Sequence, residues 1–411
     1  MNACLASAAS GLVGLVLLAC AGASSLAPPA AAVTTPDSSQ ASSDAGAEAH
    51  DARDAAPKVQ ELNAVAERIR AKYHLPSVGL AVFSSAGIVG LGASGVRKLG
   101  DATMVTTADK WHLGSDTKAM TATLLARLVD QNKARWETTM AEAYPTLALA
   151  AGYRGVTVEQ LLAHRGGVPA RPAGMQSAMY TQWDKSQGPR AAAVAKFLSE
   201  TPASTDGSWI YSNAGYMAAA AWLETAADPW EQQISREVWA PLGMNGCGFG
   251  APATAGLVDQ PWGHEDPAVA GGAYNPVAPG KFADNPRGLG PAGTVHCTLE
   301  SWGKFLSANL RAARGDTRFL SAASTTRLHT PKAAVAAGDA NDYALGWGVA
   351  RQSWSKGAAL THTGSNTINL ANTWVAPGID RAFAFVTNAA DAAADEAAND
   401  AIVELVSGAA E

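Results

Sequence analysis

The chain has 411 residues, 47% of them hydrophobic, and a formal net charge of −6. This length allows one large domain or two ordinary ones with a sizeable core. With 36 Asp and Glu against 30 Lys and Arg, the composition gives no basic surface for nucleic acid, so nucleic-acid binding is excluded.

Residues 1–20 are expected to be a signal peptide rather than part of the fold. Gly11–Cys20 is an apolar run that is too short to span a bilayer but has the length of a signal-peptide core. It ends in Leu-Leu-Ala-Cys, which resembles the lipobox of bacterial lipoproteins and implies lipidation of Cys20. Because residues 1–10 contain no Lys or Arg, cleavage at a later Ala-rich site, giving a soluble exported protein, is the alternative. We expect export to the cell envelope or periplasm, with membrane contact only through a lipid anchor.

Residues 21–57 are expected to be a flexible linker, because Ala, Ser, Pro, Asp and Glu dominate them and large apolar side chains are nearly absent. The folded domain is therefore expected at residues 58–411. Its only cysteines are Cys247 and Cys297. They can pair in an oxidising compartment, but spacing alone leaves open whether they do. Neither lies in a CxxC or Cys/His pattern, so no metal site is expected.

From residue 59 the chain shows the periodicities of regular structure. Val59–Tyr73 has apolar residues at helical spacing, and Pro76–Ser85 and Gly87–Val96 have the composition of two hairpin strands. Gly90–Gly95 matches G-x-G-x-x-G, but no helical pattern follows it, so a dinucleotide site is not expected.

Residues 120–312 are predicted to be mainly helical, with Gly- and Pro-rich loops. The C-terminal part returns to strands and closes with a helix over Asp395–Gly408. The strands are expected at Tyr343–Gln352, Ala358–Gly364, Thr367–Ala376 and Arg381–Asn388. This order predicts an α/β (α+β) fold, with one antiparallel sheet flanked by terminal helices and an inserted, mainly helical domain.

The tetrad Ser-x-x-Lys occurs three times, starting at Ser115, Ser301 and Ser353. The helix that follows Ser115 is apolar nearly all round, so Lys118 is expected to be buried and its pKa lowered towards that of a useful base. Ser301 and Lys304 oppose the apolar stripe of an amphipathic helix and are expected on a solvated surface. The third tetrad falls in a turn between two strands. We therefore select Ser115 as the candidate nucleophile.

Three motifs in order resemble those of the serine β-lactamase and penicillin-binding family, in its class C β-lactamase and D-alanyl-D-alanine carboxypeptidase branch. They are Ser115-x-x-Lys118, Tyr211-Ser212-Asn213 and His362-Thr363-Gly364, and the flanking segment Leu161–Pro169 is similar as well. The resemblance runs from Val59 to the C-terminus and implies the serine β-lactamase-like fold. The third motif departs from class C β-lactamases, which have Lys in place of His362.

The resemblance implies a role for each catalytic residue. Ser115 attacks a carbonyl carbon and forms an acyl-enzyme, while Lys118 takes the proton of its hydroxyl. Tyr211 passes a proton to the leaving group and helps to activate the deacylating water, with Lys118 as a nearby cation. Taken alone, Tyr211 and Asn213 could be a capping turn before an apolar helix, and His164 is expected to be structural.

The remaining motif residues are expected to bind substrate. Asn213 orients the substrate amide and the lysine, Thr363 of the His362-Thr363-Gly364 motif bonds an anionic substrate end, and the backbone N–H groups of Ser115 and Ser365 form an oxyanion hole. His362 is expected to titrate near its ordinary pKa of about 6.5 and to face that anionic end.

The function expected from these patterns is a serine hydrolase acting on amide, β-lactam or ester carbonyls, most similar to a β-lactamase or D-alanyl-D-alanine carboxypeptidase. The alternatives are an esterase on neutral acyl esters and a non-catalytic penicillin-binding-like sensor. The partner is a small-molecule or peptide substrate, no metal or organic cofactor is implied, and the oligomeric state stays open.

Overall fold

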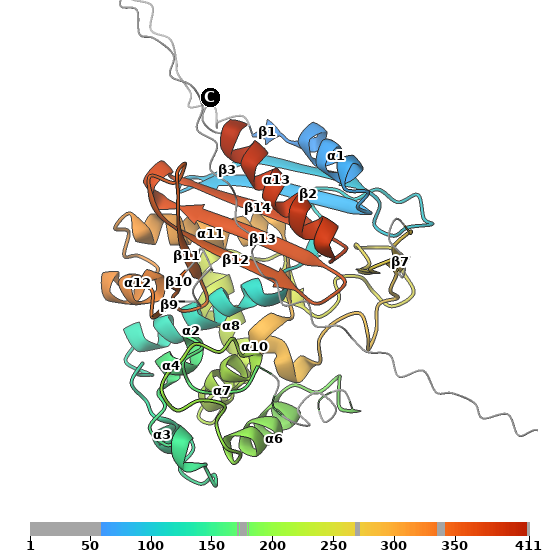
Figure 1. Cartoon of the computed structure of the whole chain (residues 1–411). Coiled ribbons are helices and arrows are strands. Elements are labelled where there is room, and N and C mark those ends of the chain that lie inside the picture. Colours follow the sequence, from blue (N-terminus) through green and yellow to red (C-terminus); the bar gives the residue numbers. More distant parts are fainter. Residues whose placement is uncertain are drawn as a thin grey trace, which may run out of the picture.

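The computed structural model describes residues 59–170, 172, 179, 181–267, 272–334 and 342–408. The expected signal peptide, the linker and Cys20 lie outside these residues. A nine-stranded sheet forms the upper half of the molecule in Figure 1. Its strands, in spatial order, are β1 (Gln60–Glu61), β3 (Gly87–Gly95), β2 (Ser77–Ser84), β14 (Arg381–Thr387), β13 (Leu370–Ala376), β12 (Gly357–Ser365), β11 (Gly348–Gln352), β10 (Asp342–Tyr343) and β9 (Ala333–Ala334). All neighbouring strands are antiparallel except β1 and β3, which confirms the predicted sheet.

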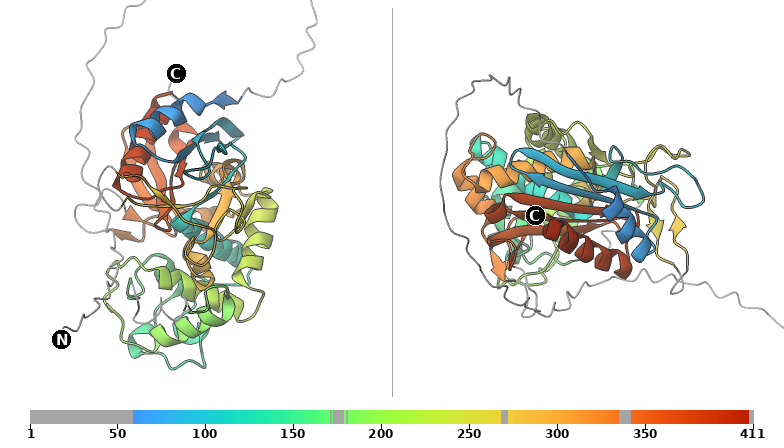
Figure 2. Two further views of the ribbon diagram at one scale, coloured as in Figure 1. Left: turned by 90° about the vertical axis from the view of Figure 1, so that its right-hand side faces the viewer. Right: turned by 90° about the horizontal axis from the view of Figure 1, so that it is seen from above.

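Helices cover both faces of this sheet, as the view from above in Figure 2 shows. The terminal helices α1 (Asn63–Lys72) and α13 (Ala392–Gly408) pack on one face, and α11 (Leu299–Ala313) packs on the other. Strand β2 is therefore buried on both sides, which explains its continuous apolar sequence. Leu80 and Val82 join the core under α1 and α13, while Phe83 points into the core that contains α11.

The predicted N-terminal helix begins later than its periodicity indicated, at Asn63 rather than Val59. Gln60 and Glu61 instead pair with β3 as the edge strand β1. Gly92 allows the backbone at Leu62 to lie directly against β3, because a Cβ on Gly92 would lie 2.3 Å from the backbone carbonyl carbon of Leu62. The G-x-G-x-x-G segment thus lies in strand β3, where its glycine allows tight packing.

The segment between the two groups of strands forms the helical lower half of the molecule (Figure 1). Besides α11, which packs on the sheet, its longest helices are α2 (Thr117–Asp130), α6 (Gln187–Leu198) and α7 (Asn213–Glu224), and α2 and α7 are buried on nearly every side. The shorter elements are α3 (Met140–Ala143), α4 (Val158–Leu162), α8 (Trp230–Ile234), α9 (Ala240–Leu242), α10 (Gly290–Gly293), α12 (Ala322–His329), the 3-10 turns η1 (Gly114–Asp116), η2 (Ala151–Tyr153) and η4 (Arg287–Leu289), and the π-helical turn η3 (Ser235–Trp239). A further 3-10 turn, η5 (Pro377–Ile379), joins β13 to β14.

Short strands interrupt this helical part, which the sequence patterns did not predict. Strands β4 (Lys110–His112), β8 (Val295–Thr298) and β5 (Cys247–Phe249) form a three-stranded sheet, and β6 (His264–Glu265) pairs with β7 (Asn275–Pro276). Strand β4 leads directly into η1 and α2, so the small sheet supports the segment that carries Ser115. No helix in the described ranges is both long and apolar enough to cross a membrane.

Candidate active site

The candidate nucleophile Ser115 lies where strand β12 meets the start of α2. It occupies the turn η1, just after Gly114, whose φ is +49°. A Cβ on Gly114 would lie 2.4 Å from the amide nitrogen of Ser365, and a Cβ on Gly364 would lie 2.6 Å from that of Ser115. Two glycines thus let the turn and the strand touch, and the contact brings the two amides together as an oxyanion hole requires.

Lys118 lies one turn along from the nucleophile and is completely buried. Its Nζ is 2.9 Å from the Oγ of Ser115 and donates to the carbonyl oxygen of Ala292, on α10, at 2.7 Å. Burial lowers the pKa of Lys118 well below its usual value, and the charge of Asp116 opposes this only in part. The neutral amine that a general base requires is therefore accessible.

Tyr211 closes the group from the loop before α7. Its hydroxyl donates to the Oγ of Ser115 at 2.9 Å, and the Nζ of Lys118 lies 4.8 Å from the centre of its ring. Burial raises the pKa of Tyr211, so the phenol keeps its proton. Because it keeps its proton, Tyr211 fits the role of proton donor better than that of phenolate base.

His164 and Tyr343 hold the tyrosine in place. The Nδ1 of His164 accepts from the backbone N–H of Ser212 at 3.1 Å, and its ring centre lies 4.4 Å from that of Tyr211 and 4.8 Å from that of Tyr343. Burial lowers the pKa of His164, which keeps the ring neutral and able to accept. Tyr343 was not singled out from the sequence, since an aromatic residue in a strand carries no functional signal.

Asn213 begins helix α7 beside Tyr211. Its side-chain oxygen is enclosed by protein atoms and has no hydrogen-bond partner within the part of the chain that the structure describes. The expected contact with Lys118 is not formed, because the lysine bonds instead to Ser115 and Ala292. The other expected role of Asn213, orientation of a substrate amide, stays a prediction, because this oxygen is not open to solvent.

The His362-Thr363-Gly364 motif lies on strand β12, whose alternation sends its side chains in opposite directions. Thr363 and Ser365 are exposed, and the hydroxyl of Thr363 accepts from the side-chain amide of Asn372 at 2.8 Å. His362 is buried, with its Nδ1 2.9 Å from the carbonyl oxygen of Thr363 and its Nε2 3.4 Å from the hydroxyl of Tyr343.

The expected titration of His362 near pH 6 is wrong. Burial, together with the charge of Lys118, lowers the pKa of His362 to about 3. The imidazole stays neutral over the whole physiological range, so β12 offers no cation from this position to an anionic substrate.

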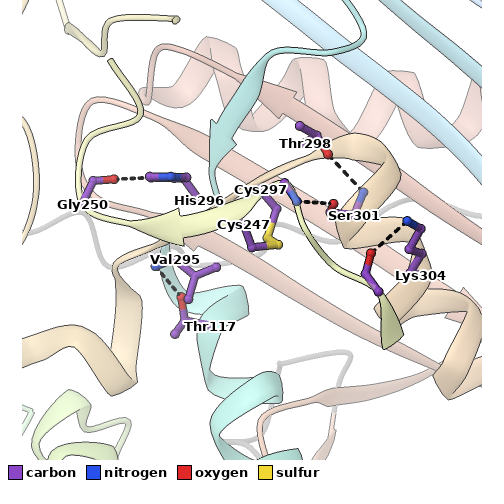
Figure 3. Close-up of a disulfide and its surroundings, with 11 residues drawn as sticks. Thr117, Cys247, Gly250, Val295, His296, Cys297, Thr298, Ser301 and Lys304 are labelled. Carbon is purple, nitrogen blue, oxygen red and sulfur yellow. Dashed lines mark hydrogen bonds between the residues drawn. A yellow bond between two sulfur atoms is a disulfide. The ribbon is translucent and has the colours of Figure 1, made fainter. Parts of the chain in front are cut away.

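The second Ser-x-x-Lys tetrad corrects another expectation, since Ser301 lies buried rather than on a solvated surface. Its hydroxyl accepts from the backbone N–H of Gly246 at 2.9 Å, while Lys304 reaches the carbonyl oxygen of Gly243, as Figure 3 shows. The apolar stripe of α11 is wide enough to include the serine. The third tetrad lies in the turn between β11 and β12, as expected, and its Ser353 and Lys356 are exposed.

Figure 3 also shows a disulfide between Cys247 and Cys297. The two residues face each other across β5 and β8, with Cα atoms 4.0 Å apart. The bond ties the middle strand of the small sheet, next to β4 and η1, to a segment 50 residues away.

A cavity of about 420 Å³ lies beside the aromatic residues of the site. Its wall includes Trp209, whose ring centre is 6.2 Å from that of Tyr211. The other lining residues are Arg165, Gly207, Ser208, Pro331, Lys332 and Asp342. Both cations are engaged, since Arg165 donates to the carbonyl oxygens of Gly207 and Lys332, and Lys332 pairs with Glu159 at 3.3 Å.

Comparisons with known proteins agree with this geometry. The model of the Beta-lactamase family matches residues 62–407, so the chain belongs to that family, whose fold is shared by serine β-lactamases and penicillin-binding proteins. Penicillin-binding protein 4 of Amycolatopsis lactamdurans is 28% identical over 78% of this chain and 83% of its own length. Unguisins hydrolase ungD' of Aspergillus campestris is 26% identical over 71% of this chain, which spans 54% of that protein.

Solved structures confirm the fold at low identity. D-amino acid amidase from Ochrobactrum anthropi superposes with a TM-score of 0.66 and 20% identity, over 85% of this chain and 99% of its own. The octameric penicillin-binding protein homologue from Pyrococcus abyssi superposes with a TM-score of 0.67 and 19% identity, over 83% and 76% of the two chains. Among the residues that the structure describes, no cluster of three or more His, Cys, Asp or Glu could hold a metal ion.

Proposed function

We propose that the chain hydrolyses amide and ester carbonyls through an acyl-enzyme on Ser115. One observation carries the proposal: the Oγ of Ser115 lies 2.9 Å from both the Nζ of a buried lysine and the hydroxyl of a half-buried tyrosine. A base and an acid at one serine oxygen are what acyl transfer needs. A module that only binds has no use for this pair, which argues against the sensor alternative.

The steps follow from the lowered pKa of Lys118 and the raised pKa of Tyr211. Neutral Lys118 takes the hydroxyl proton as the Oγ of Ser115 bonds to the carbonyl carbon, and the backbone amides of Ser115 and Ser365 stabilise the oxyanion. Tyr211 gives its proton to the leaving nitrogen or oxygen as that bond breaks, and the proton on Lys118 replaces it. Water then attacks the acyl carbon and loses a proton to the same pair, and Ser115 recovers its hydrogen.

The substrate class follows from His362. Because this histidine is neutral, the third motif has no permanent cation for a terminal carboxylate, so we propose substrates that are uncharged there. The names of relatives and structural neighbours support amide bonds, with a D-amino acid amidase and a D-stereospecific amidohydrolase among them. Nitrophenyl esters, with a better leaving group, serve as reporters, and the carboxypeptidase-like alternative predicts the opposite preference.

Matched substrates test this proposal. One D-alanyl-D-alanine peptide is offered with a free C-terminal carboxylate and with a carboxamide, beside nitrocefin and a short-chain nitrophenyl ester, with Ser115→Ala as the blank. We expect the carboxamide and ester to be preferred, with a carboxylate-to-carboxamide ratio that is constant between pH 6 and 8. His362→Lys should raise that ratio several-fold, because a charged hydrogen bond exceeds a neutral one by about 1 kcal/mol. A wild-type preference for the carboxylate would overturn the substrate assignment.

We also propose that the enzyme is exported and anchored through a lipid on Cys20, which rests on the Leu-Leu-Ala-Cys sequence alone. A lipidated N-terminus contributes about 0.8 kcal/mol per buried methylene, so the native protein should partition into detergent and Cys20→Ala should not. A mature N-terminus near Val33, found by mass spectrometry, would instead show a secreted protein without an anchor.

A further inference from the structure

A buried polar pair lies beneath the nucleophile and takes no part in the proton transfers above. His112, the last residue of β4, places its Nε2 2.7 Å from the Oδ1 of Asp284, and neither side chain has any solvent exposure. The Nδ1 of His112 accepts from the backbone N–H of Gly114 at 3.0 Å. Because Nδ1 accepts, the ring hydrogen is on Nε2, 2.7 Å from the carboxylate oxygen, but this N–H is not aligned for a hydrogen bond with it. The acceptor that this tautomer provides holds the residue before Ser115.

The same carboxylate reaches the other side of the oxyanion hole. Its Oδ1 accepts from the side-chain amide of Asn366 at 3.3 Å, and Asn366 directly follows Ser365. The Oδ1 of Asn366 accepts in turn from the side chain of Asn369 at 3.1 Å. One buried oxygen of Asp284 therefore touches partners from both segments whose amides form the proposed oxyanion hole.

A third contact joins this centre to the general base. Asn285, the next residue along the loop, donates from its side chain to the carbonyl oxygen of Gly293 at 3.0 Å. Gly293 follows Ala292, whose carbonyl holds Lys118. The loop at Asp284 and Asn285 thus meets all three backbone segments that surround Ser115: the turn before it, the end of β12, and α10.

We infer that Asp284 and His112 are positioning residues that fix the backbone amides of the oxyanion hole. The inference rests on the proposed acyl-enzyme function. Donors must lie about 2.7–3.1 Å from the oxyanion to act, and a misplacement of about 1 Å can cost around 100-fold in rate. Gly114 has no side chain to hold its backbone, so the acceptor that His112 supplies restrains the turn that the nucleophile follows.

Two substitutions of His112 distinguish the contact made by its Nδ1 from the contact made by its Nε2. In His112→Gln the amide reaches the position of Nε2 and still faces Asp284, but the acceptor for Gly114 is lost. In His112→Asn the side-chain oxygen takes the position of Nδ1 and can still accept from Gly114. The measurement is labelling of Ser115 by a fluorophosphonate, with the maximal rate constant separated from the concentration for half-maximal rate, together with thermal unfolding.

We expect His112→Gln to lower the maximal labelling rate constant about 10- to 100-fold with little change in the half-maximal concentration. His112→Asn should recover most of that loss, and Asp284→Asn should fall between them. His329→Gln is the matched control, because His329 is a histidine on α12 whose Nε2 bonds to the side-chain oxygen of Asn309 at 3.0 Å, away from the site. It should lower the melting temperature without slowing labelling.

The outcomes distinguish the two proposals. If the wild type is labelled at Ser115 and His112→Gln is labelled equally fast, or if His329→Gln slows labelling as much, the pair is only structural and the inference is wrong. If the wild type is not labelled at Ser115, the proposed function fails and the positioning role fails with it. Should His112→Gln not fold, the comparison of His112→Asn with Asp284→Asn decides: the inference requires Asp284→Asn to be labelled more slowly than His112→Asn, and labelling of both at the wild-type rate would contradict it.

Discussion

The chain carries Ser-x-x-Lys at the start of two buried helices, α2 and α11, with very different results. Ser301 is buried, whereas Ser115 is half-buried, and in both tetrads the serine oxygen lies 2.9 Å from a nitrogen. At α2 that nitrogen is the amine of Lys118, and a tyrosine hydroxyl is equally near. At α11 it is the backbone N–H of Gly246, which uses the oxygen of Ser301 as a structural acceptor.

The lysines differ still more. Lys118 is enclosed, and burial lowers its pKa. The side chain of Lys304 is 39% exposed and lies 3.2 Å from Glu300. Helix α2 is apolar on all sides, whereas α11 is amphipathic and leaves its lysine at the edge. The motif thus gains its chemistry from the surfaces packed against the helix, and the following predictions test this difference.

The largest effect is expected at the two serines. Ser115→Ala should abolish fluorophosphonate labelling and lower turnover about 10⁴-fold or more, because the acyl-enzyme cannot form. Ser301→Ala should be labelled at close to the wild-type rate. Intact-protein mass spectrometry with peptide mapping measures the labelling of both variants. Labelling that persists in Ser115→Ala would contradict the mechanism.

The two lysines should differ next most strongly. Lys118→Met removes the base and should slow acylation about 10²- to 10⁴-fold. Lys304→Met removes an exposed ion pair with Glu300 and a hydrogen bond to the carbonyl oxygen of Gly243, neither of which involves Ser115, and should leave the rate unchanged. Stopped-flow acylation by a nitrophenyl ester measures both variants. Equal losses in the two would show that burial is not what separates the tetrads.

The pH profile sharpens the same comparison. Lys118 acts as the neutral amine, so the acylation rate constant should rise about tenfold per pH unit up to the pKa of Lys118 and then level off. Since burial places that pKa well below 10.5, the plateau should begin well below pH 10.5. Lys304→Met should keep this profile, and Lys118→Met should lose it. A rate that still climbs at pH 10 would contradict the lowered pKa.

The smallest effect concerns stability. Ser301→Ala leaves the N–H of Gly246 without its acceptor and should lower the free energy of unfolding by about 1–3 kcal/mol. Ser353→Ala, at the exposed third tetrad, should stay within about 0.5 kcal/mol of wild type. Urea denaturation with the disulfide intact measures both. Equal free energies of unfolding in the two variants would mean that the hydroxyl of Ser301 contributes no more to stability than an exposed hydroxyl does.

Much of the fold could be predicted from local patterns. The β2–β3 hairpin, strands β11 to β14 and helix α13 lie where the periodicity of apolar residues placed them, because burial of one face imposes that period on the chain. The selection of Ser115 over Ser353 used the same reasoning, since a helix that is apolar all round must be buried. Where a distant segment competed, the prediction failed, as at Gln60 and Glu61, which pair with β3 instead of joining α1.

The sequence alone determined which residue types could perform acyl transfer and in what order along the chain they occur. The tertiary structure decided which of these residues are buried, which hydrogen bonds they form and how their pKa values shift. The burial of His362 beside Lys118, the carbonyl of Ala292 that holds the lysine, and the Asp284 carboxylate on His112 all come from segments far apart in the chain. No local pattern encodes such contacts, because desolvation and hydrogen bonding depend on which surfaces finally meet.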